Sequence, residues 1–285
     1  MSHMPPPLPG VILDPLVRLA LGEDLGRAGD LTTDATIPAG TQMSCEIRAR
    51  KTGRLAGMDA AAYALGLVDP TVSLKLNMQD GDVLTPGSTI ARLEGPARSI
   101  LTAERVMLNF IGRLSGIATL TAQYVAETEG TKARIVCTRK TTPGHRAVEK
   151  RAVRCGGGTS HRYGLDDAIL IKDNHIAACG GSVEKTLKRA RDYAGHLRMV
   201  EIEVDTLEQL QIALPLGPDA VLLDNMDNDT LRRAVTLIGG QCIAEASGGV
   251  TLETVAGIAA TGVDFISVGA LTHSAINLDV GMAAV

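Results

Sequence analysis

The second half of the chain repeats one pattern, in which a short apolar run is followed by a helical segment. Six such runs occur after residue 130, namely ARIVCT, DAILIK, VEIEV, AVLLD, CIAEAS and FISVG. Their last residues (138, 172, 204, 224, 247 and 269) are 34, 32, 20, 23 and 22 residues apart. Apolar strands that alternate with helices are typical of a parallel sheet covered by helices. Most runs end at a polar residue or a glycine, as barrel strands do at their catalytic edge. We therefore predict an α/β barrel, with six strands clear in the sequence.

Shorter elements fill the chain from residue 12 to residue 95. The stretch DPLVRLALGEDL predicts a helix with Asp14 as its N-cap, and MDAAAYALGLV predicts a second helix. QMSCEIRARKTGRLAG and VSLKLNMQDGDVLTPGSTIARLEG predict strands joined by Gly-containing turns. A helix from Thr102, its predicted N-cap, to about residue 128 would bridge to the barrel. We predict an N-terminal domain over 1–116, bridge helix included, and a barrel domain over 117–285.

The composition excludes some classes of protein. The 285 residues include two Phe, four Tyr and no Trp, which disfavours nucleic-acid binding by base stacking. No apolar run approaches the roughly 20 residues of a membrane span. The start, MSHMPPPLPG, lacks the basic and apolar regions of a signal peptide, and PPPLP predicts a flexible lead-in. Five scattered Cys without metal spacing indicate reduced thiols, so we expect a cytoplasmic protein.

One strongly basic segment stands out in this acidic chain. Between residues 132 and 162 there are nine Lys or Arg and one acid, a local charge of 9 − 1 = +8, whereas the chain's net charge is −4. Arg139 and Lys140 follow the first barrel strand, and His161 and Arg162 precede the second. Such cations on rigid elements suit a ligand with several carboxylates or phosphates. The helix HRAVEKRAVR between them is read as solvated surface, and the sequence leaves open whether its cations touch substrate: Lys150, Arg151 and Arg154.

Carboxylates occur at the ends of two further strands. Glu201 and Glu203 are two residues apart in VEIEVD, so both lie on one face of the strand. An acid inside a barrel is unfavourable unless it is paired or binds a metal. Glu203 and Asp224 are therefore candidate Mg²⁺ ligands. In the alternative interpretation they pair with Lys172 and Arg139, and both can hold at once.

The ends of the remaining runs carry a lysine and glycines. Lys172, in ILIKDNH, is either a Schiff-base nucleophile or an anion contact, and spacing does not separate the two. Ser247, Gly248, Gly249 and Gly269 can present backbone N–H groups to a phosphate, for which loops after late barrel strands are a common site.

Several motifs together resemble one known family. They are EDLGRAGDLTTDATIP, ERVMLNFIGRLSGIAT, CTRKTTPG, GGGTSHRYGLDDAILIKDNHI, VEIEVDTLEQL, LLDNM, EASGGV and GVDFISVGALTHS, spread from about residue 23 to residue 274. In this order they resemble quinolinate phosphoribosyltransferase, also called nicotinate-nucleotide pyrophosphorylase (carboxylating). The resemblance implies a small N-terminal α/β sandwich domain and an incomplete, seven-stranded TIM-like α/β barrel. It departs locally at Gly112, where Gln is more usual.

The resemblance also implies an activity and an assembly. The reaction is transfer of the phosphoribosyl group of phosphoribosyl pyrophosphate (PRPP) to quinolinate with decarboxylation, in NAD synthesis, with Mg²⁺ as cofactor. The assembly is a homodimer in which Arg105, by itself an ordinary helix-surface arginine, reaches the partner's site; the sequence leaves assembly beyond the dimer open. The implied dicarboxylate site comprises Arg139, His161, Arg162 and Lys172, with Lys140 near both substrates and Thr138 as a further substrate-binding residue. Glu203 and Asp224 are the implied Mg²⁺ and ribose acids, and Ser247, Gly248, Gly249 and Gly269 the implied 5′-phosphate cradle.

Three alternatives remain at this level. The first is a paralogue of the same fold with another acceptor, such as the related protein encoded with molybdate-transport genes. The second is a lysine-dependent aldolase or a sugar-phosphate isomerase that uses Lys172. The third is a protein without enzymatic activity that binds polyanions or RNA through its basic segment, which the scarce aromatics disfavour.

Overall fold

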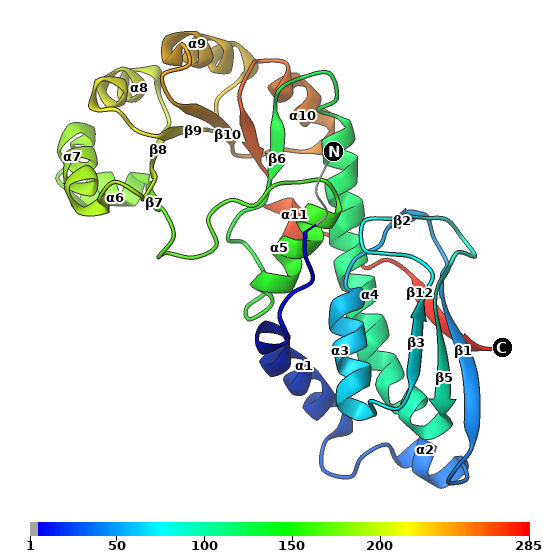
Figure 1. Ribbon diagram of the computed structural model, residues 1–285. Helices are drawn as coiled ribbons and strands as arrows, with labels where there is room; N and C mark the ends of the chain where they lie inside the picture. The colour runs from blue at the N-terminus through cyan, green and yellow to red at the C-terminus, as the bar shows by residue number, and fades with distance from the viewer. Residues whose placement is uncertain (1–4) are drawn as a thin grey trace. The chain divides into compact units, whose positions relative to one another are not determined.

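The computed structural model describes residues 5–285, so the first four residues of the segment searched for a signal peptide lie outside the described part. The chain forms two compact units. The N-terminal unit contains the chain up to Ala122 together with Thr141–Gly157 and Ala270–Val285, and the barrel unit contains Gln123–Lys140 and Gly158–Gly269 (Figure 1). The chain therefore passes between the units four times. The predicted domain boundary between residues 116 and 117 stays a prediction.

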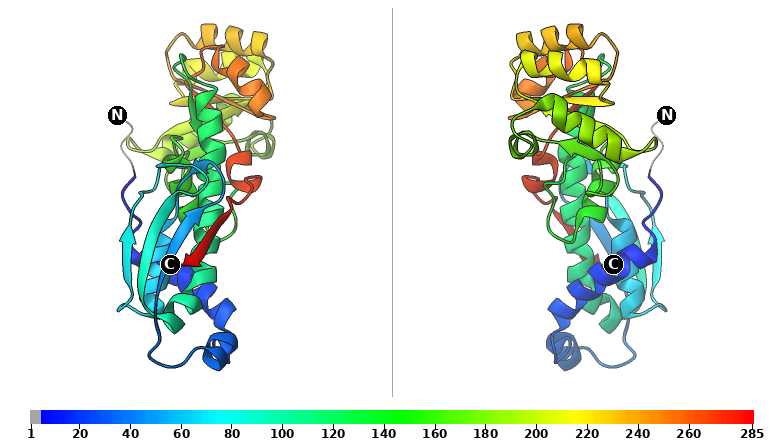
Figure 2. Two further views of the ribbon diagram at one scale, coloured as in Figure 1. Left: turned by 90° about the vertical axis from the view of Figure 1, so that its right-hand side faces the viewer. Right: turned by 90° about the vertical axis from the view of Figure 1, so that its left-hand side faces the viewer.

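The N-terminal unit is built on an antiparallel sheet with the strand order β12-β1-β5-β3. Its strands are β1 (Gln42–Ala49), β3 (Ser73–Leu76), β5 (Thr89–Pro96) and β12 (Val280–Ala284), and β2 (Gly53–Arg54) pairs separately with β4 (Val83–Leu84). The helices are α1 (Gly10–Leu25), α2 (Leu31–Thr36), α3 (Met58–Val68), most of α4 (Ala97–Ala126), α5 (Arg146–Cys155) and α11 (Ala270–His273). Figure 2 (left) looks onto this sheet, and Figure 1 shows α3 and α4 on its one covered face.

The core of this unit lies between the sheet and these two helices. Ile47 of β1, Leu93 of β5 and Ile100, Met107 and Ile111 of α4 are completely buried. Burying a side chain of this size contributes about 2 kcal/mol, so the apolar stripe of α4 explains why so long a helix stays on the sheet. α4 has 30 residues, yet neither it nor any other helix within residues 5–285 has an apolar stretch that could cross a membrane.

Two predicted N-caps are wrong, because both helices begin earlier. α1 starts at Gly10, where the amides of Ile12 and Leu13 donate to the carbonyl of Pro9. Asp14 lies inside the helix and accepts hydrogen bonds from Arg18 and from the Tyr63 hydroxyl. α4 starts at Ala97, directly after β5, so Thr102 lies in its second turn and donates to Asp30 at 3.2 Å instead. In both cases a tertiary partner takes the polar side chain that the sequence assigns to a cap.

The C-terminal segment lies across α4 at two glycines. A Cβ atom at Gly116 would lie 2.1 Å from the carbonyl oxygen of Ile276, and one at Gly112 would lie 3.0 Å from that of Leu278. The amide of Leu278 donates to the carbonyl of Gly112 at 2.9 Å. The glycine at 112 is compatible with this close approach, in which a Cβ atom would require the segment to shift by a few tenths of an ångström.

The basic helix α5 is not the solvated surface that the sequence indicated. Lys150 and Arg151 are buried, and only Arg154 of the three cations is exposed. Arg151 pairs with Asp80 and, at 3.3 Å, with Asp59. It also donates to the carbonyl of Pro6 at 3.1 Å, so the segment predicted to be a flexible lead-in is bonded to this helix. One cation of the basic segment, Arg151, is therefore balanced by carboxylates within the N-terminal unit.

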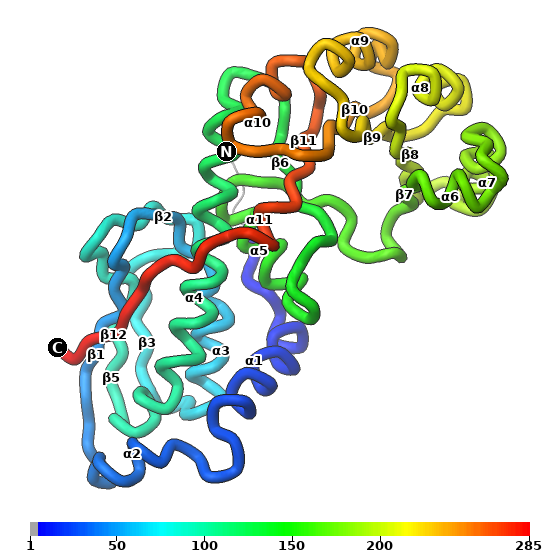
Figure 3. Tube along the Cα trace, turned by 180° about the vertical axis from the view of Figure 1, so that it is seen from behind, coloured from blue at the N-terminus to red at the C-terminus, as the bar shows by residue number. Residues whose placement is uncertain are grey.

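The barrel unit contains a parallel sheet with the strand order β6-β11-β10-β9-β8-β7. The strands are β6 (Arg134–Val136), β7 (Ile169–Ile171), β8 (Val200–Val204), β9 (Ala220–Asp224), β10 (Ile243–Ser247) and β11 (Phe265–Ser267). They alternate with α6 (Asp173–Ala178), α7 (Val183–Ala194), α8 (Leu207–Ala213), a short 3-10 turn η1 (Leu214–Leu216), α9 (Asn228–Ile238) and α10 (Leu252–Ala259). Figures 1 and 3 show the strands curving, with the helices on the outer side.

All six predicted strands are present, and the predicted fold class is confirmed. The seventh strand implied by the family resemblance is only a bridge: Thr159 pairs with Val136 in the parallel sense, beside β6. Its amide donates to the carbonyl of Ile135 at 2.8 Å and its carbonyl accepts from Cys137 at 3.1 Å. Only Thr159 pairs with β6 in this way, so this segment forms a bridge and not a strand.

Candidate active site

The predicted site residues other than Arg105 all belong to the barrel unit, and they lie at or just beyond the carboxyl ends of its strands. They follow β6 (Thr138, Arg139, Lys140), the parallel bridge at Thr159 (His161, Arg162) or β7 (Lys172), lie in β8 and β9 (Glu203, Asp224), or end β10 and follow β11 (Ser247, Gly248, Gly249, Gly269). In a parallel sheet these ends meet at one edge. Arg105 is exposed on α4, in the N-terminal unit.

Two arginines are held with buried donors that lack acceptors. Among residues 5–285, the Nε atoms of Arg139 and Arg162 are buried without a hydrogen-bond partner. Burial, and then the neighbouring Arg139 guanidinium, lower the pKa of Arg162. Buried donors without partners are unfavourable, and so are neighbouring like charges. An anion that accepts from both guanidinium groups would remove both penalties, so this arrangement is suited to a carboxylate or a phosphate.

Beside them lies a buried group of two acids and a histidine. Nε2 of His161 is 3.0 Å from a carboxylate oxygen of Glu201 and 3.6 Å from one of Glu245. Both glutamates are less than a tenth exposed, and the Oε1 atom of each has no hydrogen-bond partner within the described chain. Glu245 was not among the residues predicted from the sequence. The signal was available, since CIAEAS places an acid inside an apolar strand just as VEIEV does.

The histidine has a defined protonation state in this group. Nδ1 of His161 accepts a hydrogen bond from the backbone amide of Arg162 at 2.8 Å. The proton of the neutral ring is therefore on Nε2, which donates to Glu201. His161, Glu201 and Glu245 are close enough to hold a metal ion, but a ring that carries its proton on Nε2 has no lone pair there for a metal. We assign this group to hydrogen bonding and not to metal binding.

Glu245→Gln should change how stability depends on pH. Burial, and then the charge of Glu201, raise the pKa of Glu245 from 4.5 to about 7. The folded protein therefore holds a proton here that the unfolded chain releases above pH 4.5, and the unfolding free energy falls as pH rises from there through about 7. We expect the variant, which cannot ionise, to gain in Tm over the wild type between pH 5.5 and pH 8 by roughly 5 °C. The measurement is thermal unfolding of both proteins across that range.

An exposed carboxylate supplies the control for this experiment. Glu94→Gln removes an exposed acid from β5, in the N-terminal unit, and the Tm of this variant should run parallel to that of the wild type at every pH. Parallel curves for Glu245→Gln as well would show that Glu245 is ionised throughout the range, contrary to this assignment.

Lys172 and Glu203 form an ion pair among the predicted site residues. The lysine Nζ lies 2.5 Å from Oε2 of Glu203, and the carboxylate is far more buried than the lysine (10% against 47% exposed). The backbone amide of Lys172 donates to Nδ1 of His175 at 2.9 Å, which fixes the chain where β7 passes into α6. The pairing of Glu203 with Lys172 is the alternative that the sequence left open beside Mg²⁺ binding.

Asp224 lies where negative charge is poorly compensated. Burial, and then the charge of Asp205, raise its pKa, whereas Lys172 and Lys140 act in the opposite direction. The side-chain amide of Asn225 donates to Oδ2 of Asp224 at 2.6 Å. A divalent cation would relieve the desolvation of Asp224 and its repulsion from Asp205. These hard oxygen donors therefore fit Mg²⁺.

The glycine after β10 is required by the backbone beside it. Gly248 has φ +90°, and a Cβ atom there would lie 2.1 Å from Oδ1 and 2.8 Å from the amide nitrogen of Asn225. Asn225 itself has φ +53° and donates its amide to the carbonyl of Ser247 at 3.0 Å. Any side chain at 248 would displace this contact between the ends of β9 and β10. Asn225 lies in the family motif LLDNM but was not among the predicted site residues, because its role depends on its neighbour across the sheet.

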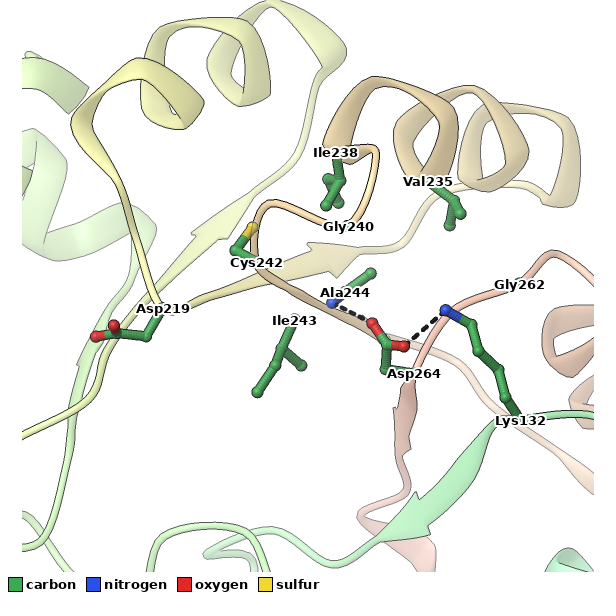
Figure 4. Close-up of a pocket in the computed structure, with 10 residues that line it drawn as sticks. All are labelled: Lys132, Asp219, Val235, Ile238, Gly240, Cys242, Ile243, Ala244, Gly262 and Asp264. Atoms are coloured by element: carbon green, nitrogen blue, oxygen red, sulfur yellow. Dashed lines mark hydrogen bonds and ion pairs between the residues drawn. The ribbon is translucent and has the colours of Figure 1, made fainter.

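A cavity of about 380 Å³ lies at the opposite edge of the sheet (Figure 4). Its residues include Asp219, Cys242 and Asp264, each directly before a strand. Asp264 accepts from Lys132 and from the amide of Ala244, and Asp219 accepts from Arg191 and Val200, so both acids are satisfied structurally. Burial raises the pKa of the Cys242 thiol, which makes it a poor nucleophile. None of the predicted site residues lines this cavity.

Comparison with known proteins identifies the family of this chain. Residues 30–115 match the family model described as the N-terminal domain of quinolinate phosphoribosyl transferase, and residues 117–283 match the one described as its C-terminal domain. A protein of Bacillus subtilis (strain 168), named probable nicotinate-nucleotide pyrophosphorylase (carboxylating), is 47% identical over 91% of this chain and 89% of its own length. A protein of Nicotiana tabacum, named quinolinate phosphoribosyltransferase (decarboxylating) 2b, mitochondrial, is 42% identical over 98% of this chain and 84% of its own.

The solved structures extend the likeness to the whole fold. The nicotinate-nucleotide pyrophosphorylase of Francisella tularensis is 37% identical, has a TM-score of 0.92 and covers 98% of both chains. Both matching domain models, the relatives and this structure lead to the same conclusion. The chain belongs to the quinolinate phosphoribosyltransferase family.

Proposed function

We propose that this protein transfers the phosphoribosyl group of PRPP to quinolinate with loss of CO₂, giving nicotinate mononucleotide and pyrophosphate for NAD synthesis. The observation that carries the proposal is the pair of arginines at the barrel edge, Arg139 and Arg162, with buried donors lacking acceptors in the described chain. Quinolinate is a small aromatic diacid that can accept from two guanidinium groups. The relatives' names, which specify quinolinate and decarboxylation or its reverse, support the same substrate.

The reaction requires no covalent bond to the protein. The pyridine nitrogen forms a bond to the ribose carbon as the bond from that carbon to pyrophosphate breaks, and pyrophosphate leaves with the electron pair. The C–CO₂ bond at the ring 2-position then breaks, its electron pair stays on the ring carbon beside the cationic nitrogen, and that carbon takes up a proton. Positioning and electrostatic stabilisation are the protein's tasks. We therefore favour Lys172 and Lys140 as charge partners over Schiff-base formation.

The side chains divide between the two substrates. Arg139, Arg162 and His161 serve the dicarboxylate, with His161 oriented by Glu201 and by the amide of Arg162. The glycines after β10 and β11 serve the 5′-phosphate. Lys172, held against Glu203, also serves the dicarboxylate, and Lys140 lies near both substrates. Each group is fixed on a strand end, so little reorganisation is needed as charge moves.

Mg²⁺ is the proposed cofactor, held by Asp224 and Glu203. The support is the donor set: a partly buried aspartate whose pKa is raised and which lies near a second aspartate, and a buried glutamate. When bound, Mg²⁺ would neutralise charge on the pyrophosphate group. Lys172 would then remain as the protein's own cation next to Glu203.

We propose a homodimer in which Arg105 enters the partner's site. The exposure of Arg105 on α4, in the unit that does not carry the other site residues, supports this assembly. A cytoplasmic location is proposed as well, because all five cysteines are free thiols and three of them are buried.

The assay that tests the proposal measures product from quinolinate, PRPP and Mg²⁺. We expect nicotinate mononucleotide and CO₂ in equal amounts, and a loss of at least about tenfold when Mg²⁺ is chelated. Product from nicotinate or another acceptor but not from quinolinate would favour the paralogue. No product at any pH or metal concentration, with tight binding of RNA, would favour the polyanion-binding alternative.

A further inference from the structure

A buried glutamate of α5 is fully hydrogen-bonded to the loop that precedes it. Glu149 is completely buried. Its Oε2 accepts from the backbone amide of Thr142 at 3.1 Å, and its Oε1 accepts from the Thr142 hydroxyl at 2.8 Å. The exposed Thr142 therefore supplies both hydrogen bonds between this loop and the buried carboxylate of Glu149.

The same carboxylate binds an arginine of α4. Nε and Nη2 of Arg113 donate to Oε1 of Glu149 at 3.2 and 2.9 Å. Arg113 also donates to the carbonyl of Thr272 and, at 3.0 Å, to that of Ala275. The ion pair thus joins α4, α5, the loop at Thr142 and the chain at the end of α11. All of these residues belong to the N-terminal unit.

The bonded segments are the ones that come directly from the barrel unit. The chain enters the N-terminal unit between Lys140 and Thr141 and again between Gly269 and Ala270. Thr142 is two residues after Lys140, and Thr272 is three residues after Gly269. The ion pair therefore fixes the points at which the TRK segment and the last glycine loop leave the barrel.

We infer that Glu149 and Arg113 are positioning residues for catalysis: through Thr142 and the carbonyls after Gly269 they fix the segments that carry Lys140 and the phosphate glycines. This inference rests on the proposed function, but no predicted site residue is part of the cluster. A hydrogen-bonded ion pair whose carboxylate is fully buried is rigid, and a shift of about 1 Å in a reacting group can lower a rate by 10²-fold. The cluster does not contact substrate. It acts on the transition state indirectly, because the segments that it holds continue directly into the ones that carry Lys140 and the phosphate glycines.

The test uses Thr142, because removing one partner of a buried ion pair endangers folding. Thr142→Val deletes the hydroxyl bond to Glu149 and keeps the exposed side chain's shape. We expect kcat to fall about tenfold, the KM for quinolinate to change by less than about threefold, and Tm to stay within about 2 °C. Thr142→Ser keeps the hydroxyl and should restore kcat to within about twofold of the wild type.

Thr71→Val is the matched control. It breaks another exposed threonine–carboxylate bond of the same unit, from the Thr71 hydroxyl to Asp69 at 2.6 Å, and should leave kcat unchanged. Wild-type kcat in Thr142→Val, or an equal loss in Thr142→Ser, would overturn the inference. So would a loss that follows a fall in Tm, since it would show a purely structural role. An inactive wild type would instead refute the proposed function itself.

Discussion

Lys172→Ala is expected to lower kcat/KM by about 10³-fold, because the active site depends on preorganised charge. Lys172 is the cation bonded to Glu203, and it also opposes the charge of Asp224. Without it, a buried carboxylate remains beside an anionic substrate, so that the variant both loses an attraction and gains a repulsion. The measurement is steady-state kinetics with each substrate varied in turn.

Lys188→Ala is the control for this substitution. Lys188 and Glu184 form an exposed pair on α7 with the same N–O distance of 2.5 Å, but both side chains are more than half exposed. Water screens such a pair, so we expect kcat/KM of Lys188→Ala to change by less than about twofold. Equal effects of the two variants would contradict the role of Lys172. Trapping of Lys172 as a reduced imine would contradict its assignment as a charge partner and favour the aldolase alternative.

Mixing Arg105→Ala with Lys172→Ala should restore activity that neither variant has alone. If Arg105 enters the partner's site, a mixed dimer has one site with both residues intact and one site lacking both. Random exchange of subunits makes half of the dimers mixed, so the unfractionated mixture should regain roughly a quarter of the wild-type activity, and the doubly tagged dimers purified from it roughly half. The measurement is the activity of differently tagged variants, unfolded and refolded together, after purification through both tags.

The interpretation of this experiment depends on showing that mixed dimers have formed. Doubly tagged dimers without activity would show that Arg105 serves its own subunit or does not serve catalysis. Mixing Lys172→Ala with Glu203→Ala is the control, because both residues lie in the same barrel unit and every site in the mixed dimer lacks one of them.

The fold was predictable where a local pattern has one physical solution. The six apolar runs became the six parallel strands because a continuous apolar segment between helices is stable only when both its faces are covered. Helix starts were less predictable. Asp14 and Thr102 have the chemistry of N-caps, but Tyr63 and Asp30 lie within reach and take those side chains. A capping preference is worth about 1 kcal/mol, which is comparable to the net contribution of one tertiary hydrogen bond, so the capping pattern alone does not decide where a helix begins.

The residues of the candidate site were likewise only partly predictable from the sequence. Strand ends and family motifs are enough to indicate Arg139, Arg162, Lys172 and Glu203, since the carboxyl ends of parallel strands meet at one edge. Glu245 and Asn225 were not among the predicted site residues, although both lie in quoted family motifs, EASGGV and LLDNM, because their roles depend on partners on neighbouring elements.

By itself, the sequence determined the order of strands and helices, the edge of the barrel that carries the polar residues, and the family. Only the tertiary structure decided which charges meet. In the folded chain Arg151 is buried between two aspartates. Glu149 binds Thr142 and Arg113. The Nε donors of Arg139 and Arg162 have no acceptors in the described chain. The physical reason is the distance along the chain over which each kind of interaction acts. Periodicity and capping act over a few residues and can be read along the chain, whereas the energy of a charge depends on burial and on partners that are distant in the sequence.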